Sequence, residues 1–152
     1  MSRLLFLTIL SVWFLCSTVE AEVIVDEPLS FGTFAIINNS SVSTISISTN
    51  DRASRTRDIQ ILYIGQAARL RLVNYPPFTR LFISPVLPQQ STVFVGTTEQ
   101  FTLSQVDMPD SIITDSLGEA SLRVGGTLET SGNGGSYIDT TYNLTLMLTI
   151  NY

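Results

Sequence analysis

The last eleven residues of the chain, 142–152, alternate between two sets of side chains, and this pattern constrains the fold more than any other stretch. One set is Tyr142, Leu144, Leu146, Leu148, Ile150 and Tyr152, and the other is Asn143, Thr145, Met147, Thr149 and Asn151. A period of two predicts a β-strand with one face in a core and the other lightly covered. No charged residue follows Asp139, and an uncharged strand at a sheet edge readily pairs with another chain. The stretch therefore predicts an all-β protein and raises the question of what covers its last strand.

The remainder of the chain predicts further short strands and no amphipathic helix. Runs rich in Val, Ile, Thr, Phe and Leu recur between Gly, Pro, Asn and Asp residues, as in β-sandwiches and barrels. The predicted strands are residues 29–37, 42–49, 59–64, 68–74, 80–84, 92–95, 100–106, 120–130 and 137–151. We expect residues 105–120 to form a loop, and Gly125 and Gly126 to mark a bulge or a close approach of two backbones. These patterns predict a single antiparallel domain of about seven to nine strands.

The N-terminus reads as a secretory signal peptide that is not part of this domain. Arg3 precedes an apolar run at residues 4–15, and small residues follow at 19–21, so we expect cleavage after Ala21. The apolar run is too short to span a bilayer comfortably. Cys16 follows Leu15, where a lipid-attachment site needs a small residue, which argues against a lipoprotein. The exported chain would be residues 22–152, with no membrane span after cleavage.

Composition argues against several classes of function. The chain has no histidine and no lysine, and its single cysteine lies in the predicted signal peptide. The usual nucleophile and base pairs of enzymes are therefore missing, and we expect no catalytic residues and no cofactor. The net charge of −5 argues against nucleic acid or an anionic membrane as a partner.

Two clusters of charged residues could be binding sites, but each has a simpler explanation. The acidic cluster consists of Asp107, Asp110, Asp115 and Glu119, and the basic cluster consists of Arg52, Arg55 and Arg57. Acidic loops can bind calcium, but this spacing fits no EF-hand, so a solvated loop is the preferred interpretation and no metal site is expected. The arginines could bind an anionic glycan, but an exposed turn explains them equally simply.

Three stretches resemble a known family. They are LSFGTF at residues 29–34, LRVGGTLET at 122–130 and GSYIDTTYNLTLMLTINY at 135–152. In this order they resemble small secreted bacterial β-sandwiches grouped as a domain of unknown function, which are similar to chaperone–usher pilins and to spore-coat protein U type pilus subunits. Two features depart from that pattern: Asn74 stands where a glycine is usual before a turn, and the segment before LSFG is shorter than a pilin's donor segment.

The resemblance implies an immunoglobulin-like, pilin-like sandwich that lacks its final strand. A groove would then border the last strand, at Tyr142, Leu144, Leu146, Leu148, Ile150 and Tyr152. The N-terminal segment of a neighbouring copy, residues 22–28, would fill it by strand addition, with Val23, Val25 and Leu29 pointing inward. Two alternatives stay open: the N-terminal segment pairs within its own chain and completes a monomer, or the last strand lies between two others.

These expectations favour an exported, non-enzymatic structural or adhesive subunit of a bacterial surface fibre. Its partners would be copies of itself, a periplasmic chaperone and an outer-membrane usher, at the periplasm or cell surface of a Gram-negative bacterium. The competing class is a monomeric secreted binding module, for example for a surface glycan.

Overall fold

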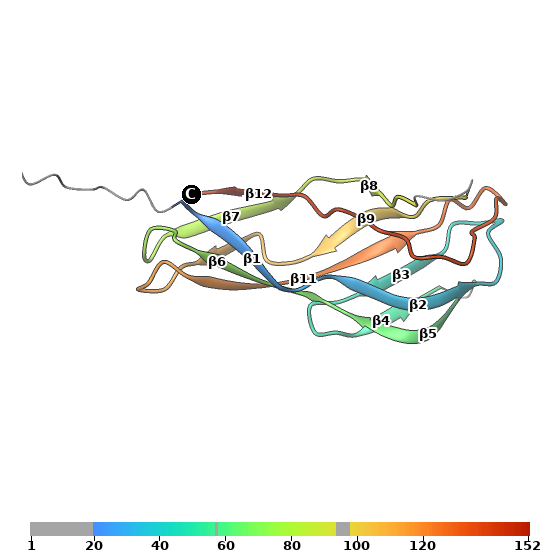
Figure 1. The fold of residues 1–152 in the computed structure, drawn as a ribbon, viewed down its shortest axis with the longest axis horizontal. Helices are drawn as coiled ribbons and strands as arrows, with labels where there is room; N and C mark the ends of the chain where they lie inside the picture. Colours follow the sequence, from blue (N-terminus) through green and yellow to red (C-terminus); the bar gives the residue numbers. More distant parts are fainter. Residues whose placement is uncertain (1–19, 57, 94–97) are drawn as a thin grey trace, which may run out of the picture.

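The computed structural model describes residues 20–56, 58–93 and 98–152, and these residues form twelve strands and no helix (Figure 1). The prediction of an all-β protein is confirmed. The predicted signal peptide lies almost entirely outside the described residues. Among the described residues there is no helix that is long and apolar enough to cross a membrane.

The strands follow one another along the chain with short connections. They are β1 (Glu22–Glu27), β2 (Ser30–Ile36), β3 (Thr44–Ile47), β4 (Ala53–Arg55), β5 (Ile59–Gln66), β6 (Ala68–Val73), β7 (Arg80–Pro85), β8 (Gln89–Gln90), β9 (Thr102–Asp107), β10 (Ser111–Ile113), β11 (Ala120–Glu129) and β12 (Leu148–Asn151).

Two predictions about individual segments are wrong. Residues 105–120 were expected to form a loop, but they contain β10, whose Ile112 lies opposite Leu81 of β7. The last strand was expected to span residues 137–151, but only β12 has a regular ladder, with a single bridge further back from Asn143 to Thr92. The segment that lies opposite the last strand, from the end of β7 to Thr92, contains two prolines, at 85 and 88. A proline has no N–H to donate to a ladder, which explains the interruption.

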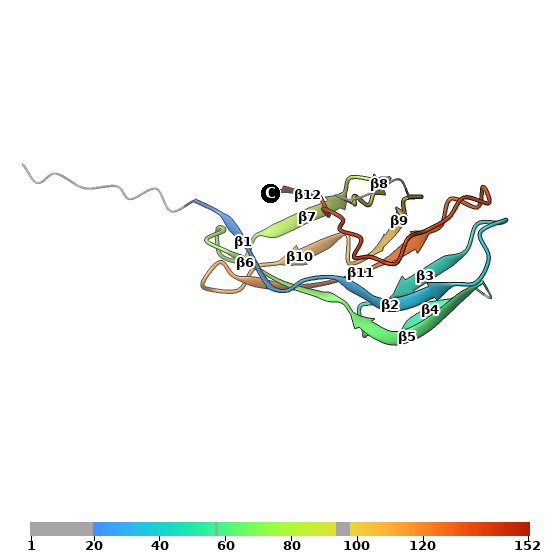
Figure 2. The same cartoon turned by 45° about the vertical axis from the view of Figure 1, so that its right-hand side comes forward.

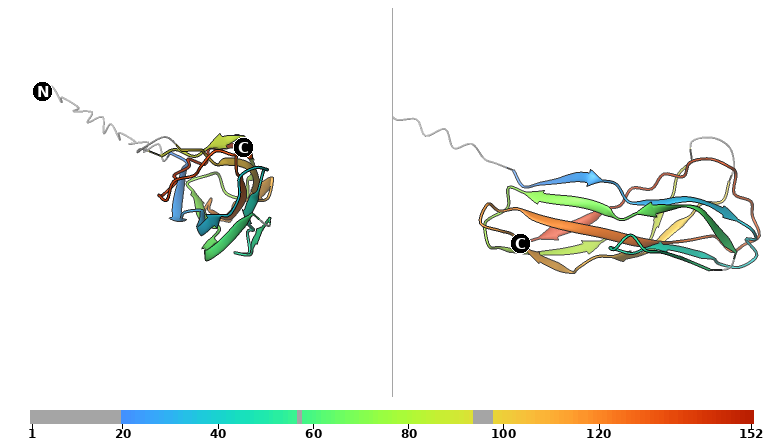
Figure 3. Two further views of the ribbon diagram at one scale, coloured as in Figure 1. Left: turned by 90° about the vertical axis from the view of Figure 1, so that its right-hand side faces the viewer. Right: turned by 90° about the horizontal axis from the view of Figure 1, so that it is seen from below.

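Most of the strands lie side by side in one curled, antiparallel arrangement, which we call the strand succession. β1 pairs with β6, β6 with β11, β11 with β9, and β9 with β8. The chain from β7 runs on into β8, and β7 pairs with β12. The succession therefore has two ends, β1 and β12, and seen along the long axis its strands surround the core (Figure 3, left).

The other strands pair with members of this succession or with one another. β3 pairs with β11 and β4, and β10 pairs with β7. β2 pairs with β5, so that β1 and β2 together run along β6 and β5 (Figure 3, right). Figures 1 and 2 show β7, β8 and β12 on one side of the molecule and β2, β4 and β5 on the other. The architecture is an antiparallel, β-sandwich-like fold.

The core consists of two clusters of buried apolar side chains. The first contains Ala68, Leu70, Leu72, Tyr75, Leu81, Ile83, Leu122 and Val124, and the second contains Ile45, Ile59, Phe101, Leu103 and Leu128. Val106 and Leu146 pack against both clusters. The side chain of Leu146 in the last strand therefore helps to join the two halves of the interior.

Strand β11 changes partners at its two glycines. Its residues up to Val124 pair with β6, and from Gly126 onward they pair with β3. A Cβ atom on Gly125 would overlap the carbonyl oxygen of Ile47, at a separation that real Cβ atoms do not reach. The predicted close approach of two backbones is confirmed, and a register shift between Thr127 and Leu128 places a bulge beside it.

Candidate assembly site

One edge of the last strand has no backbone partner among the described residues. β12 pairs with β7 over four positions, from Leu148 opposite Pro85 to Asn151 opposite Phe82. In residues 20–56, 58–93 and 98–152, no strand lies on the other side of β12. The alternative that the last strand lies between two neighbours is therefore wrong for the described part of the chain.

The inward row of the C-terminal segment 142–152, which contains β12 and is called the last strand for short, is only half covered. The five side chains of this row that pack on the core are Tyr142, Leu144, Leu146, Leu148 and Ile150. All five are half-buried and the residues between them are exposed, so the predicted alternation is confirmed. Strands inside the succession differ, since Leu72 of β6 and Leu122 of β11 are almost completely buried. The terminal Tyr152 is 66% exposed and meets only the edge of Tyr75, with ring centroids 5.3 Å apart.

The N-terminal segment pairs with its own chain. In β1, Val23 lies opposite Leu72 and Val25 lies opposite Leu70. Directly opposite residues share a face of the sheet, so the two valines lie on the core side. They nevertheless remain 39% and 59% exposed, while Leu70 and Leu72 are buried. Leu29, the third predicted inward residue, is half-buried against the first core cluster.

Apolar side chains are thus uncovered at both ends of the strand succession. The exposed valines lie on β1, and the half-buried row lies on the last strand. Both strands border the first core cluster, which Ala21 and Leu29 meet from the β1 side and Leu148 and Ile150 meet from the other. A strand that paired with β12 here would cover these side chains.

Two ion pairs hold β1 on β6 at their outer face. Arg71 donates from Nε and Nη2 to both carboxylate oxygens of Asp26, at 2.8–3.1 Å. Arg69 Nε lies 3.1 Å from a carboxylate oxygen of Glu27. The hydrogen bonds from Arg71 lower the pKa of Asp26 below its usual value. These pairs were not predicted, although the sequence carries a signal for them: two acidic residues end EVIVDE, and two arginines alternate with leucines in β6.

A third ion pair on the same face does not involve β1. Asp51, at a turn with φ of 60°, accepts hydrogen bonds from Arg123 Nη2 and from the Ala67 N–H. The bond from Arg123 is the main cause of a lowered pKa of Asp51. This pair connects the turn before β4 to β11 and to the junction of β5 and β6.

The acidic cluster predicted from the sequence is spread over separate contacts in the described part of the chain. The described residues contain no group of three or more His, Cys, Asp or Glu side chains that could hold a metal ion. Asp107 accepts the Thr49 N–H, and Asp115 accepts the N–H groups of Leu117 and Glu119. Of the predicted basic cluster, Arg57 lies outside the described residues.

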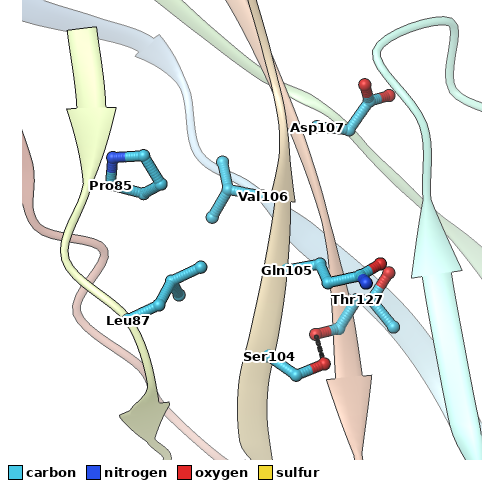
Figure 4. Close-up of a pocket in the computed structure, with 7 residues that line it drawn as sticks. All are labelled: Pro85, Leu87, Ser104, Gln105, Val106, Asp107 and Thr127. Atoms are coloured by element: carbon cyan, nitrogen blue, oxygen red, sulfur yellow. Dashed lines mark hydrogen bonds between the residues drawn. The ribbon is translucent and has the colours of Figure 1, made fainter. Parts of the chain in front are cut away.

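A hollow of about 510 Å³ separates the β7–β8 connection from β9 (Figure 4). It is lined by Pro85, Leu87, Ser104, Gln105, Val106, Asp107 and Thr127. Two of its polar side chains have partners within the chain: the Ser104 hydroxyl donates to the Thr127 carbonyl, and Asp107 accepts the Thr49 N–H. None of the lining residues belongs to β1 or to the last strand, so the hollow is separate from the open edge.

The fold and the open edge define a class: an antiparallel, β-sandwich-like protein in which β1 and β12 each have one edge without a strand partner among the described residues. Residues 22–152 match the family described as a domain of unknown function, DUF4402, and the chain belongs to this family. No curated protein and no solved structure matches the chain. The resemblance to an uncharacterised family is therefore confirmed, while the comparisons give no match to a pilin.

Proposed function

We propose that the protein is an exported, non-enzymatic structural or adhesive subunit of a bacterial surface fibre. Copies are joined by strand addition at the open edge of the last strand, and the donor is the segment at residues 22–28 together with Leu29. The subunit acts at the periplasm or cell surface of a Gram-negative bacterium, with a periplasmic chaperone and an outer-membrane usher as assembly partners.

The observation that carries this proposal is the half-covered inward row beside an unpaired backbone edge. In immunoglobulin sandwiches one sheet has the order C, F, G, so that strand F lies between strand C and the final strand G. Here β12 lies beside β7, and no described residue takes that final position. Added apolar side chains would complete the core, and a fully buried valine contributes about 1.5–3 kcal/mol. Strand addition would also supply main-chain hydrogen bonds to the exposed edge.

One observation favours the monomeric binding module as a second candidate. β1 already pairs with β6, so the N-terminal segment is not a free arm in a single subunit. In that case the open edge of β12 would stay exposed or would bind a different partner.

A shortened chain tests whether donor-strand assembly is possible. We expect residues 29–152 to be less stable than residues 22–152, because β6 loses one of its two partner strands, and not to self-associate. We also expect this shortened chain to bind the peptide EVIVDEPL, measured by fluorescence anisotropy, and to regain stability with it. A stable monomer that ignores the peptide would exclude donor-strand assembly and leave the binding module as the better account.

A further inference from the structure

We infer that β1 is an exchangeable strand. It completes its own subunit in the monomer and takes the same place on β6 of a second copy in the assembly, where Asp26–Arg71 and Glu27–Arg69 form between the two copies. This inference rests on the proposed strand addition and specifies its partner, its direction and its contacts.

Strand direction favours exchange over the insertion of an extra strand. Each pairing from β1 through β6, β11, β9 and β8 is antiparallel, and so is the pairing of β7 with β12. It follows that β6 and β12 run in the same direction and that β1 runs against both. A strand in the place of β1 is therefore antiparallel both to β6, with which it pairs, and to β12. An extra strand between β1 and β12 would be parallel to one of them, which is the slightly less stable arrangement.

The contacts of β1 are ones that a second copy reproduces in full. β1 holds to β6 through a ladder at five positions and two ion pairs, while Val23 and Val25 stay largely uncovered. Because an identical strand from another copy offers the same groups, exchange loses none of these contacts. Little apolar burial opposes the departure of β1, and Pro28 follows it before β2 begins.

The ion pairs give the exchanged strand its register and its partner. Their side chains are roughly half exposed, and exposed pairs add little stability. Opposite charges on β1 and β6 instead select a matching strand, and like charges reject a mismatched one. Reversing the charges on β1 or on β6 therefore tests whether a given β1 pairs with β6 of its own copy or of another copy.

A charge-reversal experiment tests the inference directly. The donor-reversed variant carries Asp26→Arg and Glu27→Arg, and the acceptor-reversed variant carries Arg69→Glu and Arg71→Glu. Each variant places like charges across its own β1 and β6, but in a mixture each β1 matches the other variant's β6. We expect light scattering at high protein concentration to show a two-chain complex in the equimolar mixture and no such complex in either variant alone.

Two matched controls make this result specific. A chain with all four substitutions restores opposite charges within itself, and we expect it to behave like the parent chain. The pair Asp51→Arg and Arg123→Glu lies on the same face without touching β1, so mixing those two single variants should produce no complex. A mixture of the reversed variants that stays monomeric, while the four-substitution chain is normally folded, would overturn the inference.

A covalent lock separates this inference from the proposed function. Glu22 lies directly opposite Val73, a placement that suits a disulfide and leaves both ion pairs intact, and residues 22–152 contain no other cysteine. With Glu22→Cys and Val73→Cys, we expect assembly only after reduction. If the oxidised chain assembles as well as the parent chain, exchange is wrong and strand addition stands. If the reversed variants form the two-chain complex but the parent chain never forms an assembly larger than two chains, exchange stands and the fibre proposal fails.

Discussion

Gly125 lies where two backbones meet, and its position leaves no room for a side chain. A Cβ atom there meets backbone atoms of Ile47 and Ser48, whereas one on Gly126 first meets the end of the Leu103 side chain at 3.0 Å. A flexible side chain can move, but a carbonyl within a strand cannot. We expect Gly125→Ala to lower the free energy of unfolding by about 3 kcal/mol and Gly126→Ala by about 1 kcal/mol. Equal losses in urea denaturation would show that the close approach does not limit this position.

Two carboxylates make the stability of the fold sensitive to acid. Arginine partners lower the pKa values of Asp26 and Asp51 below their usual 3.8. Because the unfolded chain takes up these protons first, the stabilisation is fully present above about pH 4 to 5 and is lost as the pH falls through the lowered values. We expect the free energy of unfolding to decrease over that acidic range, and Asp51→Asn to flatten the decrease. Asp139→Asn is the control, since Asp139 forms no ion pair in the described part of the chain, and an equal effect of both variants would contradict this account.

At the scale of the element, the last strand belongs to the core but lacks full cover. Leu146 contacts both core clusters while staying half-buried, whereas Leu72 is fully buried. We expect Leu146→Ala to cost about 2 kcal/mol in the monomer and Leu72→Ala about 3–5 kcal/mol, measured by chemical denaturation. If assembly covers the inward row, the cost of Leu146→Ala should rise in the assembled protein. The same cost in both states would show that this row is not the assembly surface.

The turn after β6 illustrates how an element can keep its geometry with a different residue. The resemblance led us to expect a glycine before this turn, and the chain has Asn74, which adopts a φ of 65°. Asparagine tolerates this left-handed conformation better than most residues. Asn74 can therefore hold a backbone conformation that usually favours glycine.

At the scale of the whole molecule, the family match begins directly after the predicted cleavage site. The family match covers residues 22–152, and the leader pattern predicts cleavage after Ala21. We expect mass spectrometry of the exported protein to find a chain that begins at Glu22. A retained Met1 or a lipid on Cys16 would contradict the export prediction, and a variant with Ala21→Arg should be cleaved poorly because the small residue is lost.

Local patterns predicted a large part of this fold. Alternation fixed which side chains of the last strand face inward, and short β-prone runs located β2, β3, β5, β6, β7, β9 and β11. These properties depend on neighbours along the chain, where a period of two already sets the face of each residue. The glycine pair was also predictable, because a strand keeps two adjacent glycines mainly where another backbone approaches closely.

The partners of the strands depended on distant parts of the chain. The segment EVIV is equally β-prone whether it is free or paired, and only the folded chain shows Asp26 and Glu27 beside Arg71 and Arg69 of β6. The interruption of the last ladder likewise follows from prolines in the segment opposite, not from the strand itself. Strand pairing brings together residues far apart in sequence, so the edges that remain open, and with them the candidate assembly site, are properties of the tertiary structure.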